Sequence, residues 1–238
     1  MRKQIKSILK SGLDKTYLAA RSTVEHLNTQ FSLVGKGPFF HSDLFPWIAE
    51  LESHWISMRK ELDVLLEKRE EIPNFQDYSV RQRAITQDDK WKTYVLYFHG
   101  FKEEENCKKC PETLRVVEKI PGMTTAFFSI LAPHKHLPEH RGPFNGVLRY
   151  HLGLMIPHER EQCRIRVGND TAFWDEGKSL VFDDAYQHEV WNNSDSERVV
   201  LFVSFMRPLP LPFSVLNRLF YRLIRISLIA PITKENHT

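Results

Sequence analysis

The first third of the chain has apolar residues at helical spacing. Residues 1–35 carry such a stripe on one side and lysines around the rest, so we expect a helix there; its apolar residues are Ile5, Ile8, Leu9 and Leu13. A Gly-Pro break at residues 35–40 predicts a turn or linker. A second helical pattern begins at Pro46, a residue that suits the first turn of a helix, and runs to Lys68.

The periodicity changes to that of strands from about residue 91. Residues 91–98 are aromatic and β-branched, and from Met123 onward short strand-like runs alternate with Pro, Gly and Asn. Many short strands at this spacing indicate an antiparallel sandwich or barrel. We therefore expect a mainly β fold, a double-stranded β-helix (cupin-like jelly roll), with N-terminal helices packed outside it and an amphipathic helix at the C-terminus.

The C-terminal segment is basic and strongly amphipathic. Arg218, Arg222 and Arg225 share one helical face, and leucine, isoleucine and phenylalanine cover much of the remainder. A helix of this kind can lie in a membrane interface, or it can dock on the protein's own core or on a partner subunit. The first alternative would give a peripheral membrane contact through residues 211–232.

Composition limits the remaining possibilities. A length of 238 residues suffices for one filled core, and we divide the chain into a helical segment (1–38), a domain with the candidate chemistry (39–208) and a basic tail (209–238). The net charge of +3 gives no reason to expect a nucleic-acid partner. There is no secretory signal, no long apolar run and no disulfide framework among three cysteines, so we expect a cytoplasmic protein, at most peripheral to a membrane.

Two histidines are candidate metal ligands. His140 lies in HRG and His188 in FDDAYQHEVW, each near a strand or loop boundary where a jelly roll can bring them together. Non-haem Fe(II) sites use two imidazoles and leave positions open for 2-oxoglutarate and O2. The usual carboxylate ligand would stand two residues after the first histidine, but Gly142 occupies that position, and a water could fill the gap. Asp183 and Asp184 are expected to form the turn before His188 through Asx hydrogen bonds.

Four further polar residues are candidates for binding the cosubstrate. Arg198 opens an apolar strand ten residues after His188 and suits bidentate binding of a carboxylate. Arg149 and His151 alternate along one strand and so face the same side. Ser129 ends another strand-like run and can donate a hydroxyl hydrogen bond. Each residue alone is more often structural, and it is their common placement that favours a site.

These residues resemble the aspartyl/asparaginyl β-hydroxylase family of Fe(II)/2-oxoglutarate dioxygenases. The resemblance covers about Phe39 to Pro208 and depends on the ordered motifs LRYHLGLMIP, W-x-EGK, FDD-x-x-x-HEVWN and RVVLF. It implies iron ligands at His140 and His188 and cosubstrate contacts at Ser129, Arg149, His151 and Arg198. The animal enzymes of the family also have glycine at the position of Gly142 and remain active.

The tail is similar to a second branch of that family, the bacterial lipid A hydroxylases, which usually have Asp at position 142. Three functions therefore stay open. The first is an Fe(II)/2-oxoglutarate dioxygenase that hydroxylates an unactivated C–H, such as the β-carbon of an aspartyl or asparaginyl residue. The second is an acyl-chain hydroxylase of the lipid A type at a membrane surface, and the third is a non-catalytic cupin-like binding protein. The resemblance implies no catalytic side chain beyond the iron site.

Overall fold

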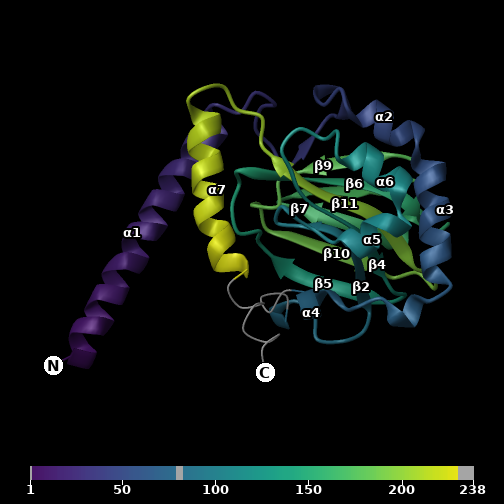
Figure 1. The fold of residues 1–238 in the computed structure, drawn as a ribbon, viewed down its shortest axis with the longest axis horizontal. Helices are drawn as coiled ribbons and strands as arrows, with labels where there is room; N and C mark the ends of the chain where they lie inside the picture. The colour runs from purple at the N-terminus through teal and green to yellow at the C-terminus, as the bar shows by residue number, and fades with distance from the viewer. Residues whose placement is uncertain (1, 79–82, 230–238) are drawn as a thin grey trace.

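The computed structural model describes residues 2–78 and 83–229, with side chains from residue 16 to residue 226 within these ranges. Two antiparallel sheets face each other (Figure 1), as expected for a jelly roll. The larger sheet has the strand order β1-β9-β6-β11-β4-β2-β3, and the smaller sheet has the order β5-β10-β7-β8. The expected mainly β architecture is therefore confirmed.

The strands of the larger sheet are β1 (Phe39–Phe40), β2 (Trp91–Phe98), β3 (Phe101–Lys102), β4 (Met123–Leu131), β6 (Val147–Met155), β9 (Ser179–Phe182) and β11 (Arg198–Met206). Those of the smaller sheet are β5 (Lys135–His140), β7 (Cys163–Val167), β8 (Asp170–Phe173) and β10 (His188–Asn192). The helices are α1 (Arg2–Gln30), α2 (Ile48–Ser53), α3 (Trp55–Leu66), α4 (Phe75–Tyr78), α5 (Glu104–Lys109), α6 (Pro111–Val117) and α7 (Phe213–Ile229), with 3-10 turns at Ser42–Leu44, Arg69–Glu71 and Arg160–Gln162.

The burial of each strand explains its sequence. β11 is apolar almost throughout because helices cover one face of the larger sheet and the smaller sheet covers the other. β7 and β10 alternate buried and half-buried residues because only one face of the smaller sheet meets the core. One apolar cluster fills the space between the sheets, with Phe127 and Val200 from the larger sheet and Ile165 and Val190 from the smaller.

The helices form two groups. α2, α3, α5 and α6 pack on the outer face of the larger sheet, whereas α1 and α7 lie side by side elsewhere on the molecule (Figure 1). The pattern from Pro46 to Lys68 predicted one helix, but the structure has two, because the backbone leaves helical geometry at His54. The expected linker at 35–40 contains the short strand β1, which pairs with β9.

The C-terminal helix docks on the protein with one face and exposes another. Phe220 and Ile224 are buried in a cluster with Val24 of α1 and Phe144, whereas Leu219, Leu223 and other apolar residues of α7 are exposed. No helix in the described ranges has the length and hydropathy needed to cross a membrane. The predicted apolar stripe of residues 5–13 and the tail residues 230–238 lie outside the described side chains.

Candidate active site

His140 and His188 meet at one end of the smaller sheet. They are register partners on the paired strands β5 and β10, and their ring centroids are 4.1 Å apart. The Nδ1 atom of His140 lies 2.7 Å from the carbonyl of Pro138, and that of His188 lies 3.1 Å from the carbonyl of Tyr186. A carbonyl only accepts, so we assign the proton of each ring to Nδ1, which leaves each Nε2 lone pair to bind a metal.

Both imidazoles are held in the neutral form that metal binding needs. Burial lowers the pKa of His140 to about 4, and the neighbouring ring of His188 lowers it further. Burial also lowers the pKa of His188, although Asp184 acts in the opposite direction. A neutral ring offers its lone pair without first losing a proton, so the pair is ready for a metal ion near neutral pH.

The residue that replaces the usual carboxylate ligand is packed against another carboxylate. A Cβ atom on Gly142 would lie 2.2 Å from Oδ2 of Asp184, so the aspartate fills the space beside this glycine. Asp184 Oδ2 accepts a hydrogen bond from Arg149 Nε at 2.8 Å and forms an ion pair with Arg149 Nη2 at 2.7 Å. Its other oxygen, Oδ1, is buried and has no partner among the described residues. Sequence spacing does not predict this arrangement.

The turn predicted before His188 is present. Asp183 accepts a hydrogen bond from the backbone N–H of Ala185 at 2.9 Å, which is the expected Asx contact. Its other carboxylate oxygen pairs with Arg207, which is buried. Within the described ranges, no cluster of three or more His, Cys, Asp or Glu residues could hold a metal. The two histidines are therefore the protein's candidate ligands here.

A buried guanidinium faces the same cavity. Arg198 is only 2% exposed, and its Nε and Nη1 atoms have no hydrogen-bond partner within the described ranges. Its Cζ atom stacks over the ring of Trp174 at 4.6 Å, and burial lowers its pKa. A buried cation without a paired anion is costly, so this arrangement favours an anionic ligand.

Two further donors point to the same kind of ligand. Ser129 Oγ accepts a hydrogen bond from Trp91 Nε1 at 3.0 Å, which leaves the hydroxyl proton to donate. His151 Nδ1 accepts from Trp174 Nε1 at 3.3 Å, so we assign its proton to Nε2, which is buried without a partner in the described structure. Burial and Arg198 lower the pKa of His151 well below its usual value, so the ring stays neutral.

Arg149 lies in the same cavity but is already engaged. It pairs with Asp184 and donates to Ser204 Oγ, so its charge is largely compensated. The structure thus brings all six predicted residues together in one cavity of about 470 Å³, with Arg149 held toward the loop of Gly142. Its direct contact with a cosubstrate stays a prediction.

Three basic residues of the cavity wall were not predicted. Arg21 comes from α1, Arg141 follows His140 directly, and His99 follows the last residue of β2. His99 has a left-handed backbone with φ of 50°, and its Nδ1 lies 3.0 Å from the hydroxyl of Tyr221 on α7. α1 and α7 thus hold or supply parts of the cavity wall, which sequence spacing could not indicate because these elements lie far from the histidine motifs.

Comparison with known proteins identifies the family. The model of the aspartyl/asparaginyl beta-hydroxylase family matches residues 52–208. The chain belongs to this family. It is 44% identical over 225 residues to the ornithine lipid ester-linked acyl 2-hydroxylase of Rhizobium tropici, a match that covers 94% of this chain and 79% of that protein. It is 35% identical over 166 residues to human aspartyl/asparaginyl beta-hydroxylase, covering 68% of this chain and 21% of that one.

Among solved structures, a Pseudomonas putida prolyl-4-hydroxylase is similar with a TM-score of 0.42 and 15% identity, covering 68% of this chain and 99% of that chain.

Membership of the aspartyl/asparaginyl β-hydroxylase family makes the protein a hydroxylase. The residues present suit the Fe(II) and 2-oxoglutarate that the family implies, because two neutral imidazoles lie in one cavity with the unpaired donors of Arg198 and His151.

Proposed function

We propose that this hydroxylase depends on Fe(II) and 2-oxoglutarate. The observation that supports this best is the buried guanidinium of Arg198 in the cavity of His140 and His188, because its Nε and Nη1 have no partner among the described residues. Bound iron would supply the oxidation of an unactivated C–H bond by O2, with 2-oxoglutarate converted to succinate and CO2. The protein supplies ligands, orientation and exclusion of water.

Each predicted residue has a role in this proposal. His140 and His188 would hold the metal through Nε2, and Arg198 would form charge-assisted hydrogen bonds to the carboxylate of 2-oxoglutarate remote from the metal. Ser129 and His151 would donate to the cosubstrate as well. The unpartnered Oδ1 of Asp184 would accept a hydrogen bond from a water that serves in place of the missing carboxylate ligand.

We further propose that the substrate is an acyl chain of a membrane lipid, hydroxylated close to the headgroup. The relative from Rhizobium tropici, whose printed name is that of an acyl 2-hydroxylase, matches the chain over nearly its whole length, including α1 and α7. The human relative supports the alternative of an aspartyl or asparaginyl residue, but this chain matches only 21% of it. Membership of a hydroxylase family argues against a non-catalytic binding protein.

The exposed face of α7 supports work at a membrane surface. Leu219, Leu223 and Ile226 are 52%, 63% and 67% exposed, and the arginines of α7 could meet anionic lipid. We propose that this face makes the peripheral contact expected for residues 211–232, of which 230–232 lie outside the described residues. A buried apolar side chain adds about 1.5–3 kcal/mol of affinity before the cost of ordering.

The test is an assay of the purified protein with Fe(II), 2-oxoglutarate and O2, offered either ornithine lipid in phosphatidylcholine vesicles or an aspartyl-containing peptide. We expect one oxygen atom to be added to the lipid acyl chain, with stoichiometric succinate, and no turnover by His188→Ala. Hydroxylation of the peptide alone would establish the alternative substrate. Lipid hydroxylation without consumption of 2-oxoglutarate would refute the proposed cosubstrate.

A further inference from the structure

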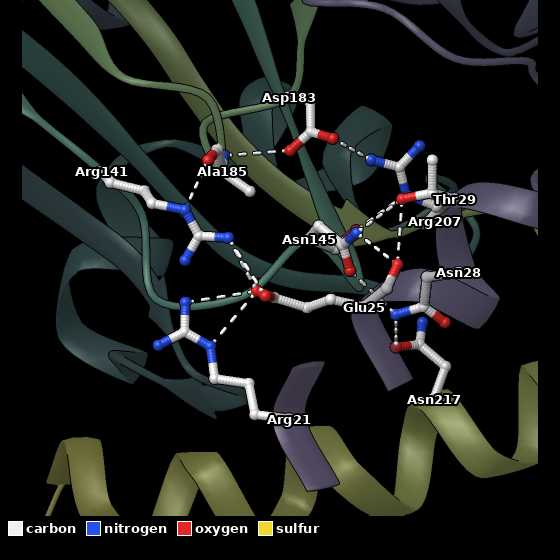
Figure 2. Close-up of polar contacts among 10 residues, drawn as sticks. All are labelled: Arg21, Glu25, Asn28, Thr29, Arg141, Asn145, Asp183, Ala185, Arg207 and Asn217. Atoms are coloured by element: carbon white, nitrogen blue, oxygen red, sulfur yellow. Dashed lines mark hydrogen bonds and ion pairs between the residues drawn. The ribbon is translucent and has the colours of Figure 1, made fainter. Parts of the chain in front are cut away.

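Two arginines share one carboxylate at the wall of the active-site cavity. Glu25 of α1 accepts hydrogen bonds from Arg21 Nε and Nη2 at 3.2 Å, and from Arg141 Nη2 at 3.0 and 3.1 Å. Figure 2 shows the carboxylate of Glu25 between the two guanidinium groups. Arg21 and Arg141 both line the cavity that contains His140 and His188.

This cluster is fixed in place by a polar network between α1, α7 and the loop after His140. The buried Asn28 donates to Asn145 and to Asn217, at 3.1 Å in each case (Figure 2). Asn145 donates to the carbonyl of Glu25 at 2.8 Å, and Asn217 donates to the carbonyl of Gly146 at 2.8 Å. Buried polar groups with satisfied hydrogen bonds specify one arrangement, so α1 is held against this loop.

The charges in the cluster do not balance. Two guanidinium groups face one carboxylate. Of the other arginines of the wall, Arg149 is already paired with Asp184, and Arg198 is the one assigned to the cosubstrate above. The hydrogen bonds of Arg21 and Arg141 within the described structure use only Nε and Nη2 of each. Nη1 of each group is therefore left to bind a ligand, and the excess positive charge selects an anionic oxygen group.

The place of the cluster limits which part of a substrate it can hold. Arg141 is the residue after His140, and its Nε donates to the carbonyl of Ala185 at 2.6 Å, which ties it to the turn before His188. An anion bound between Arg21 and Arg141 would therefore lie close to the metal ligands. A substrate held in this way would present a carbon near its charged group, and the far end of an acyl chain would lie beyond reach.

We propose that Arg21 and Arg141 bind the anionic group of the substrate's headgroup, so that the N-terminal helix forms part of the substrate site; this rests on the lipid substrate proposed above. Glu25 is a positioning residue that holds the two guanidinium groups apart and oriented. The substrate class is a lipid with a carboxylate or phosphate in its headgroup, and for the proposed amino-acid lipid it is the free carboxylate. The same contact explains oxidation near the headgroup.

The experiment compares two probes with three variants. Wild type, Arg21→Gln, Arg21→Lys and Arg115→Gln are assayed on ornithine lipid and on its methyl ester in phosphatidylcholine vesicles, with KM and kcat measured separately. Arg115 is the matched control, because it too forms an ion pair within its own helix, with Glu112 at 2.9 Å, and it does not line the cavity. Turnover of 2-oxoglutarate without lipid and thermal unfolding report whether each variant is folded.

We expect Arg21→Gln to raise KM for the acid lipid about tenfold, the size of one lost charge-assisted hydrogen bond, and to leave KM for the ester almost unchanged. Arg21→Lys should recover part of the loss, and Arg115→Gln should behave as wild type. An equal effect of Arg21→Gln on both lipids would show a structural role and overturn the inference. Failure of the wild type on both lipids would instead overturn the proposed lipid substrate, and this inference with it.

Discussion

Gly142 offers a sharp test of the site, because the family's usual carboxylate ligand would stand there. Any side chain at this position meets Asp184: an added Cβ would lie 2.2, 2.3 and 2.5 Å from its Oδ2, Cγ and Oδ1. Ordinary van der Waals contact begins near 3.4 Å. We therefore predict that Gly142→Asp does not restore a third ligand and that even Gly142→Ala is strongly destabilising.

The magnitude follows from how firmly Asp184 is held. Asp184 is 4% exposed and its carboxylate is paired with Arg149, so the carboxylate cannot move into solvent without breaking that ion pair. Overpacking alone costs about 1–3 kcal/mol. Removing one partner of a buried ion pair costs about 3–5 kcal/mol. We expect Gly142→Ala to lower the free energy of unfolding by about 3 kcal/mol, between these limits.

A double-mutant cycle measured by denaturant unfolding checks this reasoning. With Asp184→Ala as the background, the atoms that Cβ would meet are gone, so Gly142→Ala should cost less than about 1 kcal/mol. The difference of about 2 kcal/mol is the coupling free energy between positions 142 and 184. An equal cost of Gly142→Ala in both backgrounds would refute the packing of Asp184 against this glycine.

Three further predictions follow from the cavity and from α7. Arg198→Lys should raise the KM for 2-oxoglutarate at least about tenfold, since an ammonium cannot reproduce the guanidinium's paired donors; an unchanged KM would exclude this role. Burial lowers the pKa of His99 to about 4 in the folded protein, whereas the pKa is about 6.5 in the unfolded chain. Between these two pH values the unfolded chain binds a proton at His99 and the folded protein does not. The free energy of unfolding should therefore fall as pH drops from about 6.5 to 4, and less so in His99→Asn. The double variant Leu219→Ser, Leu223→Ser should bind vesicles about tenfold more weakly in a co-sedimentation assay. The control variant Val64→Ser, at an exposed position of α3, should bind them as wild type does.

The sequence predicted the jelly roll because the pattern of apolar and polar residues in each strand follows which faces of that strand are buried. β11 is apolar on both faces and β7 alternates, as their sheets require. The pairing of His140 with His188 was also predictable, because each lies in a short motif at the end of a strand. The break at His54 was not, since the apolar spacing continues through it.

The missed residues share a physical cause. Arg21 reaches the cavity only because α1 is held on the loop of residues 141–146 through Asn28 and Asn145, contacts across more than a hundred residues of sequence. Asp184 was correctly placed in a turn, but its position over Gly142 depends on how two loops meet. Such contacts are set by tertiary packing and leave no periodic signal.

The most direct test of the account is anaerobic titration of the purified protein with Fe(II) and 2-oxoglutarate, followed by visible absorption. A charge-transfer band that appears only with both additions, and is lost in His188→Ala and Arg198→Ala, is the result we predict. Absence of the band in wild type, with bound iron shown by metal analysis, would contradict the proposed iron and 2-oxoglutarate site.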